Sequence, residues 1–572
     1  MSKIEKYLSA ILSLAFTLGV FLFFNAKYAG HLHFQEQNQL FEATFGYFRE
    51  VCSLPGGFAD WAGRYLTQFC YAGWPGALGI ALLLCLVQLL CYAVSGKKSL
   101  VAYAFSFAAP VILTVFLLDD KALTGSIAAI ALCLGGVLLI KSLNKGLLRT
   151  ILTLALIPAL YWSCGPLVII YALCLPADEH LGVRIAAPLL ALAFPLISVL
   201  FLHCPLPRLM TGVHYYRFPQ TIPSVLWIGA LAAVLYYWGT RLNTKSAVSS
   251  WKKTVAGLLS ACVIALAGMC LINGKADMSS ETMMKYDWLL RCGDWDGIIK
   301  EASLKMPDKP LSVSALNLAL AMTGNMSERM FCYLQSGSAG LFPAYSISYT
   351  TLLPTSEIFW QLAMTNACQE YTFESQEAIP DFQKSARCYL RLAETNLVNG
   401  DAKVAMKYAR TLEKTRYYSK AAKEIELLAG NDSLVDAHPV YGRMRALHAT
   451  DRVCLFNEND KASMLSQLLD VNPDNSLAEE YMLNLYLLEK DMDTFSAALG
   501  GISRGTLPKH WQEALLLQCV SHGYDLAEVD ARISADNSAR MLDFVKDIKS
   551  SKNQGYMHRT YGDTYWYYCI YR

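Results

Sequence analysis

The residues of this sequence that could carry chemistry are concentrated in residues 26–75, directly after the first apolar run. Near the start of this segment a single carboxylate, Glu36, stands between two glutamines, with His31 and His33 shortly before it. A carboxylate can take a proton from a hydroxyl or position a metal ion that does so. Glu36 is therefore a candidate catalytic residue, and His33 is predicted as a substrate-binding residue. The structural alternative is that the histidines cap helices at the membrane surface.

A second polar segment, residues 203–217, contains Arg208 and Arg217. The planar guanidinium group makes paired hydrogen bonds to phosphate oxygens, so these two arginines are predicted to bind a substrate phosphate. The alternative is that they anchor lipid head groups. Asp119 and Asp120 form a third polar feature, which would either meet a cation or make a solvated turn. No metal ligand set stands out, and a divalent cation is implied only if the protein is a transferase.

The elements that must position these residues follow from the distribution of charge. Residues 1–275 hold 19 lysines and arginines and 9 acidic residues, whereas the rest of the chain holds 30 and 38. A charge-poor front half and a charge-rich back half indicate a membrane domain, residues 1–275, followed by a water-soluble domain, residues 276–572. The cysteines show no zinc or disulfide spacing, and no basic stripe suggests binding to nucleic acid.

A membrane-spanning helix needs about 20 mostly apolar residues. Seven stretches meet this requirement clearly: residues 7–25, 76–95, 100–118, 122–140, 184–202, 222–240 and 254–273. An eighth stretch, 147–175, would be about 43 Å long as one helix, which is too long for one span and too short for two. It contains Gly165-Pro166, at which the chain could reverse.

Basic residues near the ends of spans mark the cytoplasmic side. If residues 147–175 cross twice, all four basic clusters fall on one side; if they cross once, the last cluster, with Arg241 and Lys245, falls on the other. We therefore predict about nine spans, a cytoplasmic N-terminus, and residues 276–572 on the outer side together with the loop 26–75. Whether 147–175 crosses once or twice stays open at this stage.

The soluble half shows apolar residues at helical spacing. Tyr389, Leu392-Ala393, Gly400 and Ala405 resemble the tetratricopeptide pattern, in which small residues allow two paired helices to approach closely. The fold class is therefore predicted as all-α: a polytopic transmembrane helical bundle followed by a soluble α-solenoid of tetratricopeptide-like helix pairs. An irregular helical bundle is the alternative. Residues 387–412 are expected to form one antiparallel pair that turns near Gly400.

A first span followed by a long, structured outer loop with an acidic residue near its start resembles the GT-C glycosyltransferases, which use polyprenyl-phosphate-linked sugars. That resemblance implies that Glu36 activates the acceptor and that Arg208 and Arg217 hold the lipid phosphate. The family's pair of adjacent acids is reduced here to one carboxylate.

The motifs Leu54-Pro-Gly-Gly57 and Tyr65-Leu-Thr-Gln-Phe69 also resemble an uncharacterised family of polytopic membrane proteins from Bacteroides-type bacteria, which implies a bacterial inner membrane. Two functions follow as hypotheses. One is an inner-membrane envelope protein that displays a periplasmic helical-repeat interaction domain to a protein or glycan partner. The other is a GT-C-like transferase of a polyprenyl-phosphate-linked sugar. A transporter is the third hypothesis, disfavoured because acidic residues are missing from the interiors of the spans, where ion-coupled carriers keep them.

Overall fold

The computed structural model describes residues 2–217, 221–242, 250–346, 348, 350–380, 383–449, 460–501, 505–523 and 532–572. The part of the chain described is helical and contains no strand, only two isolated β-bridges. The chain divides into two compact units. Unit 1 comprises residues 1–282, 379–387 and 411–419, and unit 2 comprises residues 283–378, 388–410 and 420–572. Nothing in the sequence itself indicates that residues 379–387 and 411–419 pack with unit 1.

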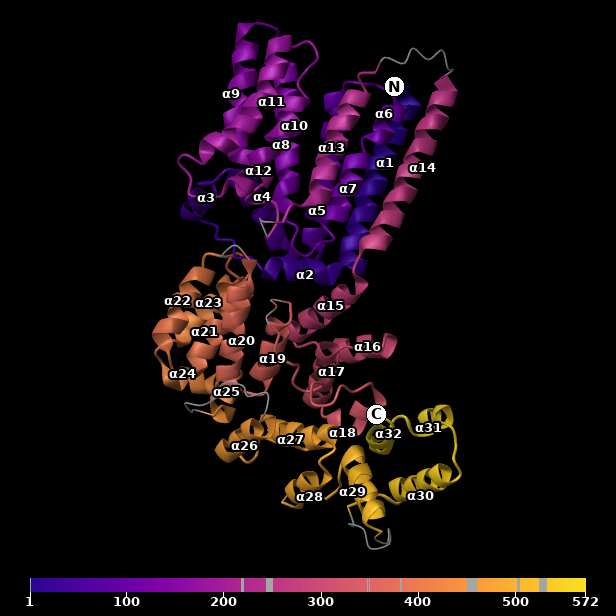
Figure 1. Ribbon diagram of the computed structural model, residues 1–572. Helices are drawn as coiled ribbons and strands as arrows, with labels where there is room; N and C mark the ends of the chain where they lie inside the picture. The colour runs from indigo at the N-terminus through magenta and orange to yellow at the C-terminus, as the bar shows by residue number, and fades with distance from the viewer. Residues whose placement is uncertain are drawn as a thin grey trace. The chain divides into compact units, whose positions relative to one another are not determined.

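Unit 1 is a bundle of long apolar helices that run side by side, with the short helix α2 lying across one end (Figure 1). Its elements are α1 (Lys3–Leu22), the π-helical η1 (Phe23–Lys27), α2 (Ala29–Gln37), α3 (Phe45–Val51), α4 (Gly57–Thr67), η2 (Gln68–Ala72), α5 (Trp74–Ser95), α6 (Leu100–Phe105), α7 (Ala108–Phe116), α8 (Thr124–Ser142), α9 (Leu147–Cys164), η3 (Gly165–Leu167), α10 (Val168–Leu173), α11 (Leu181–Ser198), α12 (Leu206–Thr211), α13 (Ser224–Gly239) and α14 (Ser250–Lys275).

Six helical stretches among the described residues are long and apolar enough to cross a membrane: Lys3–Lys27, Trp74–Ser95, Thr124–Ser142, Leu147–Leu173, Leu181–Ser198 and Trp251–Lys275. This is fewer than the nine spans predicted. The predicted spans 100–118 and 222–240 form shorter apolar helices, Leu100–Phe116 and Ser224–Gly239. The first of these is also interrupted between α6 and α7. These helices indicate a membrane protein, and six of the described stretches are long enough to span the bilayer.

The stretch 147–175 folds back on itself at Gly165. The hydroxyl of Tyr171 on α10 donates to the carbonyl of Thr153 on α9 at 3.0 Å, whereas 18 residues of one straight helix would span about 27 Å. Arg149, near the start of α9, also pairs with Asp178 at 3.1 Å, beyond the end of α10. The two legs therefore form a hairpin whose ends lie close together, with a second leg much shorter than the first.

The two ends of unit 1 differ in character. The basic end holds Lys97, Lys98, Lys141, Lys145 and Arg149, and the side chain of Lys141 reaches the carbonyl of Val94 at 3.2 Å. The opposite end, called the loop end below, holds residues 26–75, 119–123 and 204–217. Its segments are joined by bonds such as Arg217 N to Lys121 O at 3.0 Å. Lys245, one of the basic residues used to predict orientation, lies outside the described residues.

The tip of the hairpin is fixed by Tyr215, a fully buried residue from the loop end. Its hydroxyl accepts a hydrogen bond from the backbone of Leu167 at 3.0 Å and donates one to the carbonyl of Cys164. The tip in turn supports residues 26–75, because Gly56 N donates to Trp162 O at 2.9 Å and the indole of Trp162 donates to Cys52 O at 3.0 Å. The hairpin tip therefore supports residues 52–56 of the loop end.

Helix α4 lies against the first turn of α8 with no side chains between them. A Cβ built on Gly63 would fall 2.2 Å from the backbone nitrogen of Gly125, so only glycine permits this approach. This close backbone contact fixes the position of α4, and with it Asp60 and Arg64, relative to the first turn of α8.

Unit 2 consists of shorter helices. They are α15 (Met278–Cys292, which begins in unit 1), α16 (Trp295–Leu304), α17 (Pro310–Met322), α18 (Met326–Arg329), η4 (Met330–Cys332), α19 (Leu352–Gln361), α20 (Thr365–Ala378), α21 (Ala386–Val398), α22 (Ala402–Leu412), α23 (Ser419–Leu428), α24 (Asp432–Ala437), α25 (Tyr441–Leu447), α26 (Lys461–Val471), α27 (Ser476–Glu489), α28 (Met492–Gly500), α29 (Lys509–His522), α30 (Ala535–Lys549), α31 (Gln554–Tyr561) and α32 (Tyr565–Tyr571).

The helix pair predicted at residues 387–412 is confirmed. The chain turns between α21 and α22 at Gly400, whose φ of 86° is in the left-handed region. The rings of Tyr389 and Tyr408 meet across the pair at 5.1 Å, and the small residues Ala393 and Ala405 are fully buried. A regular solenoid of such pairs stays a prediction.

We predict that removing the hydroxyl of Tyr215 loosens the hairpin tip. In Tyr215→Phe the ring is kept, but the buried N–H of Leu167 loses its acceptor, which costs about 1–3 kcal/mol. Thermal unfolding of the full chain in detergent should show a lowered melting temperature. Tyr65→Phe is the control, because the ring of Tyr65 is 43% exposed. Equal melting temperatures for the two variants would contradict the role given to Tyr215.

Candidate anion-binding site

Helix α2 crosses the loop end and is fixed at its N-terminus by the carboxylate of Glu281, in the first turn of α15. The two oxygens of Glu281 accept hydrogen bonds from Gly30 N at 2.7 Å and His31 N at 2.8 Å. A negative charge at this position also meets the positive end of the helix dipole. The anchoring sets the direction of α2, and with it the position of Glu36 in the last turn of the helix.

The carboxylate of Glu36 is buried and lies against Tyr418. The hydroxyl of Tyr418 is 2.9 and 3.0 Å from the two carboxylate oxygens. Glu36 lines a cavity of about 10 Å³, which is the space of a single water molecule and too small for a sugar acceptor. Its role as a catalytic base therefore stays a prediction, and its partner comes from a segment far along the chain.

Residues 379–387 and 411–419 are built into the loop end. Ala386 N donates to Gln39 O at 3.1 Å, and the guanidinium of Arg387 donates to the side-chain oxygen of Gln37 at 2.6 Å. The ring of Tyr417 stacks on Tyr71 at 4.7 Å. These contacts enclose the segment that follows α2, in which Asn38 and Gln39 are buried.

A larger cavity of about 200 Å³ opens beside this segment. Its lining comes from the segment after α2, the turn before α4, α4 itself, the residue before α8, residues 204–217 and residues 379–387: Asn38, Gln39, Leu54, Asp60, Arg64, Leu123, Cys204, Arg208, Val213, His214, Arg217 and Gln383. Gln39 also lines the small cavity at Glu36, so the two spaces are neighbours. We call the larger space the arginine cavity.

An ion-pair cluster centred on Asp60 forms one wall of the arginine cavity. One carboxylate oxygen of Asp60 lies 2.8 Å from the guanidinium of Arg64, one helical turn later, and 3.2 Å from Nδ1 of His214. The side chain of Asp60 is 3% exposed. A buried carboxylate is tolerated only beside opposite charge or donors, so α4 and residues 213–217 are held together here.

Arg217 and Arg208 bring further positive charge to the cavity. The buried guanidinium of Arg217 donates to the carbonyl of Asn38 at 2.9 Å and to the side-chain oxygen of Gln35 at 2.8 Å. These two bonds orient the guanidinium on the wall of the cavity. Arg208, from α12, is half-buried on the same cavity.

The imidazole of His214 is kept neutral. Burial lowers its pKa, and the neighbouring Arg64 and Arg208 lower it further, against the opposing effect of Asp60. Its Nε2 atom is buried and has no hydrogen-bond partner among the described residues. Among the described residues, the charged side chains that line the cavity are three arginines and one aspartate. The site is suited to an anion.

The structure brings together only part of the predicted site. Arg208 and Arg217 line the arginine cavity, as predicted for a phosphate clamp, whereas neither Glu36 nor His33 is among its lining residues. His33 instead faces Gly73, whose Cβ position would be 3.3 Å from the imidazole. Glu36 and the two arginines, which a transferase would need in one site, therefore line different cavities, because Glu36 lies against Tyr418.

Three residues of the arginine cavity were missed in the sequence: Asp60, Arg64 and His214. The spacing of Asp60 and Arg64 is that of an ordinary surface ion pair on a helix, which gives no functional signal. Asp119, considered for a cation, instead accepts from the hydroxyl of Tyr216 at 2.8 Å and from the backbone of Lys121. Within the described ranges, no group of three or more histidine, cysteine, aspartate or glutamate side chains could hold a metal ion.

The buried His31 makes the loop end sensitive to acid. Burial is the main cause that lowers its pKa from 6.5 to about 4, although Asp119 acts in the opposite direction. Between these values the unfolded chain binds the proton and the folded chain does not, so stability falls as the pH drops from 6.5 toward 4. The shift corresponds to about 3 kcal/mol.

We predict that His31→Gln reduces this loss, which melting temperatures measured between pH 7 and pH 4 would detect. His203→Gln, at an exposed histidine of the same end, should leave the acid sensitivity of the wild type. Any dependence of the melting temperature on pH that remains in His31→Gln is expected to come from other groups such as His214. Parallel curves for wild type and His31→Gln would show that the imidazole of His31 is not kept neutral by the fold.

Comparison with known proteins identifies the chain only at the level of a family. No curated protein and no solved structure matches it. The sequence model of a family of unknown function, DUF6057, matches residues 4–572, which include both units and every residue of the arginine cavity. The chain belongs to the DUF6057 family of unknown function.

Proposed function

We propose that this protein is an integral membrane protein of the bacterial cell envelope that binds the phosphate-bearing head group of a lipid-linked ligand in the arginine cavity. The observation that carries this proposal is the presence of Arg64, Arg208 and Arg217 around one cavity. Guanidinium groups are weakly hydrated and match the oxygens of phosphate in pairs, so they suit a phosphate at a membrane surface.

The volume of the cavity limits the size of the ligand that it can bind. Sites for whole small molecules usually measure about 300–1,000 Å³, whereas the arginine cavity measures about 200 Å³. It can take a phosphate and the atoms next to it, and the rest of a lipid-linked sugar would extend outside. Polar groups such as Asn38 and Gln383 on the same walls would meet the neighbouring hydroxyls.

The path of the chain indicates on which side of the membrane the arginine cavity lies. The hairpin at Gly165 favours two crossings by residues 147–175, although only six stretches among the described residues have the full length of a span. The basic residues Lys97, Lys141 and Arg149 then lie at the end opposite the arginine cavity. By the positive-inside rule the basic end is cytoplasmic and the loop end is periplasmic.

A transferase of polyprenyl-phosphate-linked sugars is the chemical form of this proposal that the GT-C resemblance implies. In the wall of the arginine cavity, the contact of Asp60 with Nδ1 of His214 leaves the neutral Nε2 to act as a base. His214 would take the proton of an acceptor hydroxyl while the hydroxyl oxygen bonds to the sugar. The sugar–phosphate bond breaks in the same step, and Arg208 and Arg217 hold the leaving phosphate. This geometry favours His214 over Glu36 as the base.

Unit 2 has a role in either form of the proposal. The confirmed helix pair at Gly400 supports a helical interaction domain that meets a protein or glycan partner, as expected from the sequence. If the arginine cavity binds no anion, the protein would serve as a membrane-anchored scaffold that displays this domain to its partner.

We predict that Arg208→Gln weakens binding of polyprenyl monophosphate to the purified full chain in detergent by about tenfold, because a charged hydrogen bond is lost. Native mass spectrometry can measure the bound fraction. Polyprenol, which lacks the phosphate, is the matched ligand and should bind weakly to both proteins. Arg184→Gln is the matched variant, because Arg184 lies at the start of α11, near the basic end, 5.5 Å over Trp238. Equal binding by wild type and Arg208→Gln would refute the phosphate site.

We also predict that the end of the chain, Arg572, lies on the side opposite Lys97 and Lys98. Alkaline phosphatase fused after Arg572 should be active, since this reporter folds only outside the cytoplasm, and a green fluorescent protein at the same position should stay dark. The reverse pattern would overturn the proposed orientation. Fusions placed after Ser142 of a shortened chain provide the control, because they should give a cytoplasmic result.

A further inference from the structure

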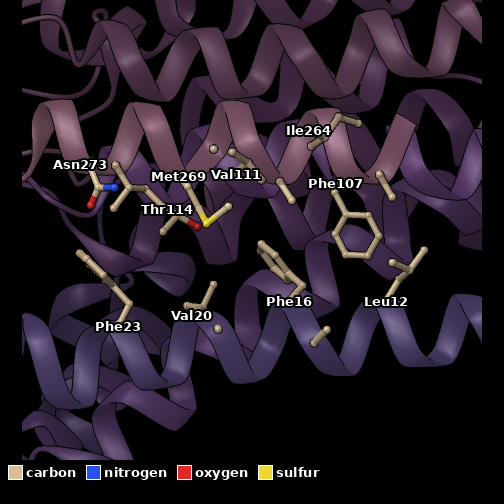
Figure 2. Close-up of a pocket in the computed structure, with 16 residues that line it drawn as sticks. Leu12, Phe16, Val20, Phe23, Phe107, Val111, Thr114, Ile264, Met269 and Asn273 are labelled. Atoms are coloured by element: carbon tan, nitrogen blue, oxygen red, sulfur yellow. The ribbon is translucent and has the colours of Figure 1, made fainter. Parts of the chain in front are cut away.

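A long apolar groove runs between α1 and α14, with Phe107 and α7 forming its floor (Figure 2). It has a volume of about 460 Å³. Figure 2 shows Leu12, Phe16, Val20 and Phe23 of α1 facing Ile264, Met269 and Asn273 of α14 across the groove. Apart from Thr114 and Asn273, the side chains that line the groove are apolar.

Small residues keep the groove open. Gly268 brings α14 so close to α7 that an added Cβ would fall 2.8 Å from a methyl group of Val111. Gly19 on α1 faces the groove, and the position of its Cβ has no other heavy atom within 4 Å. The tight contact of α14 with α7 and the missing side chain on α1 together leave space that neighbouring side chains do not fill.

Polar contacts hold α1 and α14 together at both ends of the groove. At the basic end the hydroxyl of Thr254 donates to Glu5 at 3.1 Å, and at the loop end Nζ of Lys27 donates to the amide oxygen of Asn273 at 3.3 Å. Between these two contacts the lining is apolar, so the space is a slot of fixed length.

The length of the slot matches one leaflet. From Leu12 to Phe23 on α1 it extends for about 16 Å, and from Ala261 to Asn273 on α14 for about 18 Å, compared with about 15 Å for half of the hydrocarbon core. Its polar end, with Asn273 and the exposed ammonium of Lys27, lies at the loop end. The apolar part and the polar mouth therefore follow the order of a lipid tail and its head group.

We propose that this slot binds one acyl tail of an anionic phospholipid from the leaflet at the loop end, with the lipid phosphate beside Lys27. The inference rests on the membrane placement of α1, α7 and α14 and is independent of the arginine cavity. The apolar length of the slot and its polar mouth at Lys27 and Asn273 match a single acyl tail with its head group.

The experiment uses the full chain in nanodiscs that contain phosphatidylglycerol or phosphatidylcholine with a photoreactive group in the acyl tail. After irradiation, labelled peptides are identified by mass spectrometry. Wild type should be labelled on residues of α1 and α14 that line the slot, more strongly by phosphatidylglycerol. Gly19→Leu fills the slot, so labelling there should fall to background. Gly135→Leu is the matched control, because Gly135 lies on α8 away from the slot and also has open space at its Cβ position.

Lys27→Gln tests the mouth of the slot. It should remove the preference for phosphatidylglycerol while leaving labelling by phosphatidylcholine unchanged. Labelling that persists in Gly19→Leu at the level of Gly135→Leu would overturn the proposal, as would cross-links between the α14 peptides of two copies in place of lipid adducts. Equal labelling of wild type by the two lipids would overturn the assignment of an anionic head group.

Discussion

The buried carboxylate of Asp60 is the interaction on which the loop end depends. A single ionised carboxylate removed from water is unstable by several kcal/mol unless opposite charge or donors lie against it. Arg64 supplies that charge from the same helix and His214 supplies a contact from a segment about 150 residues later. Any movement that separated α4 from residues 213–217 would remove the His214 contact and leave the carboxylate with Arg64 alone. The arginine cavity exists because these two segments are kept together.

The cavity also depends on backbone packing below it. Gly63 and Gly125 allow α4 to rest directly on α8, and Tyr215 fastens the tip of the hairpin that supports residues 52–57. The loop end is therefore built on rigid helices of the bundle, which is the arrangement that holds charged side chains at fixed distances. Residues 379–387 and 411–419 close the other side and bury Glu36 against Tyr418.

Local patterns in the sequence predicted what local physics determines. Long apolar runs predicted the helices of unit 1, Gly165-Pro166 marked the reversal, and Gly400 with Ala393 and Ala405 marked the helix pair in unit 2. The site was predicted only in part. Arg208 and Arg217 were found from their residue type, but no periodicity predicts that Tyr418 reaches Glu36 across 382 residues. The ion pair of Asp60 had the spacing of a surface pair, and only the fold buries it.

The central claim is that the arginine cavity, and not the surroundings of Glu36, receives an anionic head group. Cryo-electron microscopy of the full chain in nanodiscs, with and without polyprenyl monophosphate, tests this claim most directly. We expect new density within hydrogen-bond distance of the guanidinium groups of Arg208 and Arg217, and only when the phosphate lipid is added. Density at Glu36 with an unchanged arginine cavity, or no ordered density in the cavity at saturating ligand, would contradict the account.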